Sequence, residues 1–259
     1  MAAVFFDIDG TLLDFTNHIP ESTKEAMRLL HENGHLTFIC SGRTRGYIRY
    51  PGLFEMGFDG IVSGGGTMIE YNGEVLYYKQ LEKDTAVRVV DAARRYGFRP
   101  ILEGREYLYM DDEDFADDRY GRKLFSELGP YRKDIKSGYG EWEISKLSCA
   151  TDGKDPEAFI REIEDDFEPI IHTINVVELV PKGSGKGAGI RKVCELLDLD
   201  INDTYAVGDS ANDLDMFEAA GTAIAMGNGS DIAKEHADYI TTAMADDGIY
   251  NAMKHFGLI

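Results

Sequence analysis

The chain has 259 residues, enough for one large or two small domains with a sizeable hydrophobic core. It carries 47 acidic and 27 basic residues, so its net charge is −20 and its isoelectric point is near 4.6. Such a negative surface repels nucleic acid and anionic lipid, so we expect neither partner, and any phosphate site needs local positive charge or a metal.

Cysteine usage and the start of the chain suggest a compartment. Cys40, Cys149 and Cys194 are odd in number and far apart, which excludes a disulfide framework and a CxxC zinc ribbon. No apolar run approaches the roughly 18 residues of a membrane-spanning helix, and the first residues lack the pattern of a signal peptide. We therefore expect a reducing, cytoplasmic location.

The first third of the chain alternates strand and helix signals. Residues 3–8 and 36–40 are short apolar runs, and both end on polar residues. Between them, Ser22 and Glu25 are spaced as a capping box for a helix that Gly34 ends. Residues 60–63 form a further strand-like run. Strands that are apolar on both faces and separated by helices indicate a parallel sheet covered on both sides.

The middle of the chain, residues 82–182, differs in its element types. We expect helices at 85–96 and 156–167, and short strands around 106–110, 142–149 and 174–180. The acidic run at 111–118 is typical of a solvated loop or helix start, and its spacing does not fit a calcium loop. The whole segment is predicted to be an α+β insertion, followed by a glycine-rich linker at 181–187.

The last third returns to the first rhythm. The expected elements are helices at 188–197, 212–220 and 230–237, and strands at 204–207 and 222–226. We therefore predict an α/β protein with a doubly wound parallel sheet, built from residues 1–81 and 183–259 around the insertion. Ligands in such sheets bind beyond the carboxyl ends of the strands.

Two carboxylates stand where the first strand ends. Residues i and i+2 of a strand point to one face, so Asp7 and Asp9 would repel each other there. A bound cation would compensate for this repulsion, and so would a proton held on one of them. The alternative is turn chemistry, since Asp-Gly is common in turns.

Three later sites also follow predicted strands or precede helices. Ser41 and Gly42 could donate hydrogen bonds to phosphate oxygens, although an ordinary helix cap is the alternative. Lys186 could neutralise a carboxylate or a phosphoryl oxygen, and its surroundings fail the Walker A pattern. Asp209 stands where a second carboxylate could share a metal with Asp7, and oxygen ligands favour Mg²⁺. Asn212 and Asp213 begin the next helix.

With these residues in view, the chain resembles the haloacid dehalogenase superfamily, most closely its Cof-type branch of phosphatases with a type IIB cap. FFDIDGTLLD matches the first motif, ICSGR the second, Lys186 the third and VGDSANDLDM the fourth. HADYITTAMADDGI near the end is also similar. The chain departs from the family at Gly64, where Asn is usual, and at Gly185, where Ser is common.

The resemblance implies a Rossmann-like core (1–81 and 183–259), a cap (82–182) and specific roles for the motif residues. Asp7 would attack phosphorus, and Asp9 would act as acid and then base. Mg²⁺ would be held by Asp7, Asp209 and the backbone carbonyl of Asp9. Ser41, Asn212 and the backbone N–H groups near Ile8 and Gly42 would grip the phosphoryl oxygens. Lys186 would offset charge between Asp7 and the phosphoryl group, and Asp213 would orient either Lys186 or a metal-bound water.

The implied activity is hydrolysis of a small phosphorylated metabolite, a sugar phosphate or a phosphorylated cofactor. Two alternatives are a phosphomutase acting on a sugar phosphate and a non-catalytic protein that binds phosphate as a regulator. In the insertion, substrate contacts are conceivable for Arg105, Tyr107, Arg119 and Lys146, but surface charge is the expected explanation for each. Trp142 is expected to be a packing residue.

Overall fold

The computed structural model describes residues 1–173 and 175–259, except for the side chains of residues 119, 120, 172 and 173. The chain forms two compact units. The first unit comprises Met1–Gly42, Tyr50–Tyr77 and Gly185–Ile259, and the second comprises Arg43–Arg49 and Tyr78–Ser184. The predicted domain boundaries stay a prediction, and the compact units differ from them in assigning residues 43–49, 78–81 and 183–184 to the second unit.

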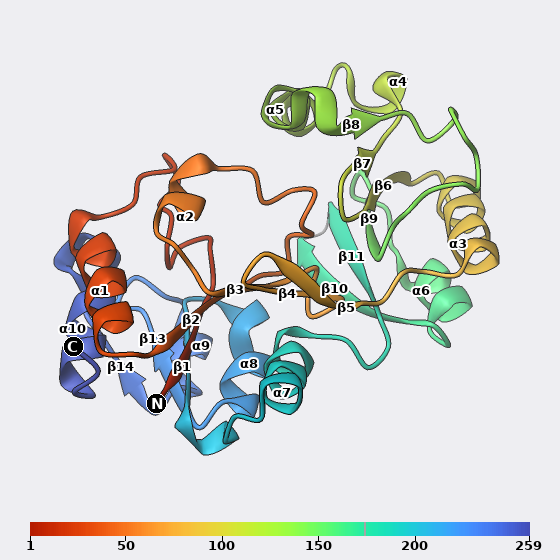
Figure 1. The fold of residues 1–259 in the computed structure, drawn as a ribbon. Helices are drawn as coiled ribbons and strands as arrows, with labels where there is room; N and C mark the ends of the chain where they lie inside the picture. The colour runs from red at the N-terminus through yellow and green to blue at the C-terminus, as the bar shows by residue number, and fades with distance from the viewer. Residues whose placement is uncertain (174) are drawn as a thin grey trace. The chain divides into compact units, whose positions relative to one another are not determined.

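A mixed sheet forms the centre of the first unit (Figure 1). In spatial order, the described strands are β14 (Tyr239–Ile240), β13 (Thr222–Ala225), β12 (Thr204–Gly208), β1 (Ala3–Phe6), β2 (Leu36–Cys40), β3 (Gly60–Ser63), β4 (Met68–Tyr71) and β5 (Glu74–Tyr78). The strands from β14 to β3 pair in parallel, and β4 pairs antiparallel with β3. The predicted α/β fold is confirmed, with an antiparallel addition at one edge.

Helices cover both faces of this sheet. They are α1 (Glu21–Glu32), α2 (Pro51–Glu55), α7 (Lys186–Leu197), α8 (Leu214–Ala219), α9 (Asp231–Glu235) and α10 (Gly248–His255), with 3₁₀ turns at Ile201–Asp203, Ala211–Asp213 and Met244–Asp246. All four residues of β1 are buried. Because side chains alternate along a strand, Phe5 joins the cluster under α7 and α8, where it stacks on Phe38 of β2.

The predicted capping box of α1 is wrong. The helix begins at Glu21, so Ser22 lies inside its first turn, and Pro20 occupies the cap position without a side-chain hydrogen bond. Proline suits this end because its fixed φ is compatible with a helix start. Lys24 instead pairs with Glu21 on the exposed face of the helix.

The second unit is built on a six-stranded sheet, antiparallel except for β7 with β8. In spatial order its strands are β10 (Phe167–Thr173), β11 (Val176–Pro181), β9 (Lys146–Ala150), β6 (Arg99–Glu103), β7 (Leu108–Tyr109) and β8 (Arg132–Lys133). Its helices are α3 (Lys83–Arg95), α4 (Asp112–Phe115), α5 (Arg119–Leu128), α6 (Glu157–Ile163) and a 3₁₀ turn at Gly129–Tyr131.

One face of this second sheet packs on helices α3 and α6 (Figure 1). Leu102, Leu147 and Leu179, from three neighbouring strands, lie in that cluster together with Trp142, whose predicted packing role agrees with its burial. The helix expected at 156–167 ends at Ile163, since the residues from Phe167 onward form the edge strand β10.

One expectation about charge in the insertion is wrong, and a second holds for only part of its segment. Lys146 is 2% exposed rather than on the surface, and it lies on the face of β9 opposite Leu147, paired with Glu103 and Glu178. The acidic run at 111–118 contains the expected helix start, α4, and residues 112, 113, 116 and 117 are exposed. Its two ends are paired, because Asp111 is buried against Arg94 at 2.5 Å and Asp118 pairs with Arg99 at 2.9 Å. In the folded chain, charged side chains that look solvent-exposed in the sequence are thus paired with side chains of opposite charge.

Among the described residues, no helix is both long enough and apolar enough to cross a bilayer. All three cysteines are free and buried.

Candidate active site

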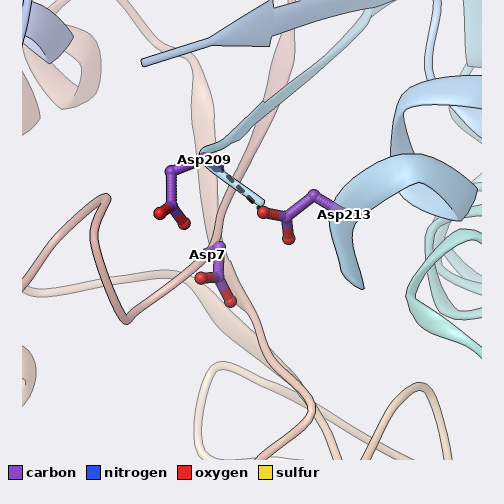
Figure 2. Close-up of side chains that lie close together, drawn as sticks. All are labelled: Asp7, Asp209 and Asp213. Carbon is purple, nitrogen blue, oxygen red and sulfur yellow. Dashed lines mark hydrogen bonds between the residues drawn. The ribbon is translucent and has the colours of Figure 1, made fainter. Parts of the chain in front are cut away.

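The site is positioned by the reversal of strand order in the first sheet. Strand β1 lies between β12 and β2, so the chain segments that follow β1 and β12 leave the same edge side by side. Such a switch point is where open α/β sheets bind ligands. Asp7 directly follows β1 and Asp209 directly follows β12, and Figure 2 shows their carboxylates side by side.

Asp7 is buried and held by hydrogen bonds of its backbone and its side chain. Its backbone N–H donates to Val207 O at 2.9 Å, which extends the pairing of β1 with β12 by one residue. The residue is 3% exposed, and its Oδ1 accepts a hydrogen bond from the Lys186 ammonium at 2.7 Å. Burial raises the pKa of Asp7 to about 7, although Lys186 acts in the opposite direction.

Asp209 lies against the chain that follows Asp7. A Cβ built on Gly10 would be only 3.0 Å from Asp209 Oδ1 and closer still to its Oδ2, so the approach requires glycine at position 10. Gly10 also has a φ of 81°, in the left-handed region. Burial, reinforced by the neighbouring Asp213 carboxylate, raises the pKa of Asp209 to about 7.

Lys186 connects two carboxylates. It begins α7, is 3% exposed, and donates to Asp213 Oδ1 at 2.5 Å as well as to Asp7. Burial lowers the pKa of Lys186, but the Asp213 and Asp7 carboxylates outweigh it and raise the pKa well above the ordinary value. Asp213 Oδ2 accepts the N–H groups of Asp209 and Ser210 at 2.9 and 3.0 Å, and Figure 2 shows the first of these bonds.

The acidic group fits a small divalent cation. Oxygen atoms of Asp7, Asp209 and Asp213 lie within 4.8 Å of one another. Both oxygens of Asp213 already accept hydrogen bonds, whereas Asp209 Oδ1 is buried without a hydrogen-bond partner in the described part of the chain. Hard carboxylate oxygens are typical Mg²⁺ ligands. The open oxygens therefore favour Asp7 and Asp209 as ligands and Asp213 as the group that orients Lys186.

The turn after β1 separates Asp9 from Asp7. The strand ends at Phe6, and the Ile8 carbonyl accepts the N–H groups of Leu12 and Leu13 at 2.9 and 2.8 Å, which closes a tight turn. The regular alternation assumed for the two carboxylates is therefore wrong, because Asp7 is buried and Asp9 is exposed. Asp9 is still close enough to raise the pKa of Asp7.

The remaining predicted residues lie along the same edge. Ser41 follows β2, is 2% exposed, and its N–H donates to Val62 O at 2.9 Å; Gly42 comes next. Asn212 lies on the 3₁₀ turn at Ala211–Asp213, where its side-chain oxygen accepts the Ser210 hydroxyl at 2.5 Å. No described contact joins Asn212 to the three carboxylates.

Two contacts beside Lys186 were not predicted from the sequence. The Asp215 carboxylate accepts the N–H of Gly187, and the glycine turn at residues 64–66 contacts the residue before Lys186. Gly-Gly-Gly after a strand was visible in the sequence, but its partner 120 residues away was not.

Two residues of the insertion were considered as substrate contacts. The ring of Tyr107 lies under the Lys133 ammonium, with Nζ 3.3 Å from the ring centroid, and the Arg119 side chain is outside the described residues.

The switch point of this α/β sheet thus brings together three carboxylates that could hold a cation and one buried lysine. Such a site is typical of an enzyme that acts on an anionic phosphoryl group. Comparison with known proteins agrees. The family model described as haloacid dehalogenase-like hydrolase matches residues 4–253. A protein of Bacillus subtilis (strain 168), "Putative phosphatase YkrA", is 33% identical over 99% of this chain and 98% of its own length.

Two further matches extend the likeness. Another Bacillus subtilis protein, the 5-amino-6-(5-phospho-D-ribitylamino)uracil phosphatase YwtE, is 25% identical over 96% of both chains. A solved structure described as a HAD subclass IIB sugar phosphatase superposes with a TM-score of 0.86 and 25% identity, covering all of both chains. The chain therefore belongs to the haloacid dehalogenase-like hydrolase family, in its Cof-type phosphatase branch.

Proposed function

We propose that the chain hydrolyses a small phosphorylated metabolite through an aspartyl-phosphate on Asp7, with Mg²⁺ as cofactor. The observation that carries the proposal is the position of the Asp7 carboxylate. It is buried at the switch point, held by Lys186 through one oxygen, and grouped with Asp209. A carboxylate has two oxygens, so one oxygen of Asp7 would face the cation while the other attacks phosphorus.

The first step forms one bond and breaks another. An Asp7 oxygen attacks phosphorus, the bond from phosphorus to the leaving oxygen breaks, and that oxygen takes a proton from Asp9 to leave as an alcohol. Asp9 suits this role because it is exposed beside a buried nucleophile. When bound between Asp7 and Asp209, Mg²⁺ would offset the negative charge of the phosphoryl oxygens.

The second step regenerates the enzyme. Asp9, now a carboxylate, takes a proton from water, the water oxygen attacks phosphorus, and the bond from phosphorus to Asp7 breaks to release phosphate. Ser41, Asn212 and the N–H groups of Ile8 and Gly42 would donate to the phosphoryl oxygens. The Lys186 ammonium stays beside Asp7 throughout and offsets charge as it develops.

The proposed substrates are sugar phosphates and phosphorylated cofactors. Relatives are named for a ribitylamino-uracil phosphate and for phosphoglycolate, and a structural neighbour is described as a sugar phosphatase. We propose residues 1–81 and 183–259 as the catalytic core and 82–182 as the cap that selects the substrate. The free, buried cysteines agree with the cytoplasmic location we propose.

The test is phosphate release from a panel of phosphorylated metabolites with Mg²⁺, for the wild type and Asp7→Asn. We expect Mg²⁺-dependent release by the wild type and a loss of at least about 10³-fold in the variant, because removing a nucleophile removes the covalent route. An isomerised sugar phosphate without free phosphate would indicate the mutase instead. Binding without turnover would indicate the regulatory protein, and near-normal turnover by Asp7→Asn would remove Asp7 from its role.

A further inference from the structure

The backbone on both sides of Lys186 is anchored by two groups that have no part in the proposed reaction. The N–H of the preceding residue, Gly185, donates to Gly65 O at 2.7 Å. The N–H of the following residue, Gly187, donates to Asp215 Oδ2 at 2.9 Å. The Lys186 ammonium makes its contacts to Asp7 and Asp213 from a backbone fixed at both neighbours.

The Asp215 anchor comes from α8, the helix that follows the Asp213 turn. Residue Asp215 approaches α7 so closely that a Cβ on Gly185 would lie 2.5 Å from its Oδ2, and a Cβ on Gly187 would overlap its backbone carbonyl. The first N–H groups of a helix have no partner within the helix, and an acceptor there also interacts favourably with the helix dipole. Asp215 thus caps α7 from a neighbouring helix, at the residue next to Lys186.

The second anchor is the glycine turn that joins β3 to β4. Gly64, Gly65 and Gly66 have φ values of 62°, 60° and 78°, three successive residues in the left-handed region. A Cβ on Gly66 would overlap the Gly185 carbonyl oxygen and lie 3.0 Å from Gly189 N. Gly65 also donates its N–H to Ser41 O at 3.0 Å, so one turn connects the end of β2 with the start of α7.

We propose that Asp215 is a positioning residue for Lys186, and that it works with the 64–66 turn to hold the ammonium between Asp7 and Asp213. The inference rests on the proposed function, since it concerns the lysine of that same reaction. No described hydrogen bond or ion pair joins Asp215 to the Asp7 carboxylate or to the Lys186 ammonium, although the Asp215 carboxylate is near enough to Lys186 to interact with it electrostatically. Its positioning effect passes through the backbone of residues 185–187, because its hydrogen bond holds the Gly187 N–H.

The first experiment compares Asp215→Ala with Asp215→Asn, using p-nitrophenyl phosphate and Mg²⁺. In Asp215→Ala we expect kcat to fall by about 10- to 100-fold, the size of effect that a small displacement of a catalytic group produces. The KM and the Mg²⁺ concentration for half-activation should stay within about twofold, since neither substrate nor metal contacts are removed. In Asp215→Asn the amide oxygen can accept the Gly187 N–H, so kcat should recover to within about fivefold of wild type.

Glu218→Gln is the matched control. Glu218 lies on the same helix, but it is exposed, so the same loss of one carboxylate should leave kcat unchanged.

The second experiment uses a matched pair of glycines. Gly66 and Gly73 have nearly the same φ, 78° and 81°, but a Cβ on Gly73 meets nothing within 4 Å. Gly73→Ala therefore measures the backbone strain alone, and Gly66→Ala adds the overlap with Gly185. We expect kcat to fall in Gly66→Ala and to stay at the wild-type level in Gly73→Ala.

Crystal structures of wild type and Asp215→Ala complete the test, because they do not depend on turnover. We expect the Lys186 ammonium to be displaced from Asp7 and Asp213 in the variant. An undisplaced ammonium, an unchanged kcat in Asp215→Ala, or a shifted Mg²⁺ requirement would overturn the inference. An inactive wild type would refute the proposed function instead, and the Lys186 position in the variant would still decide whether Asp215 holds it.

Discussion

Asp209 is a carboxylate whose burial works against the stability of the metal-free protein. Its pKa is raised from 3.8 to about 7, so the folded state holds a proton that the unfolded state releases. Stability from this group is fully present below about pH 4 and is lost as the pH rises to and beyond about 7. At pH 8 the charged form therefore opposes folding, and Asp209→Asn removes that charge.

The magnitude follows from the shift. A change of roughly three pKa units corresponds to about 4 kcal/mol at 1.36 kcal/mol per unit, and solvent screening at this partly exposed group reduces it to about 2 kcal/mol. We predict that Asp209→Asn in EDTA at pH 8 is more stable than wild type by about 2 kcal/mol, while phosphatase activity is abolished. Below about pH 4 the difference should vanish.

The assay is urea unfolding followed by circular dichroism from about pH 3 to about pH 8, with and without Mg²⁺. Glu218→Gln, an exposed substitution on α8, serves as the control and should follow wild type at every pH. Mg²⁺ should stabilise wild type and leave Asp209→Asn unaffected, because binding to the folded state alone raises stability. If Asp209→Asn is less stable than wild type at pH 8 in EDTA, the reasoning from burial is wrong.

The other predictions concern the insertion and the phosphate grip. Lys146→Met should destabilise the protein by about 3–5 kcal/mol, since it leaves the buried Glu103 and the partly buried Glu178 without their cation. The fluorescence of Trp142, the sole tryptophan of the sequence, can be used to follow this unfolding. Lys83→Met removes an exposed pair and should cost less than about 1 kcal/mol, so equal losses in the two variants would contradict the argument. Ser41→Ala should lower kcat by about 10²-fold through the loss of one donor to the phosphoryl group, and steady-state kinetics showing an unchanged kcat would exclude that role.

Several features could be predicted from local sequence because they depend on local physics. Apolar runs such as residues 3–8 and 36–40 predict buried strands, and the structure has strands at Ala3–Phe6 and Leu36–Cys40. Polar residues placed directly after parallel strands are expected at one edge of the sheet. The same physics predicts that Asp7 and Asp209 lie close together, and the structure groups them. The prediction that Asp7 and Asp9 share one face of a regular strand was wrong. The chain turns at Ile8, whose carbonyl accepts hydrogen bonds from Leu12 and Leu13, and strand periodicity does not describe such a turn.

What the amino-acid order determined by itself was the α/β rhythm and the carboxylates at strand ends, since these follow from the period of a strand and the position of its last residue. Only the tertiary structure decided which charged and polar groups are paired with one another. Lys146 meets Glu103 and Glu178 from neighbouring strands, and Gly187 meets Asp215 from another helix. Such partners lie 28 to 43 residues apart, so their contact depends on sheet register and helix packing rather than on any local pattern.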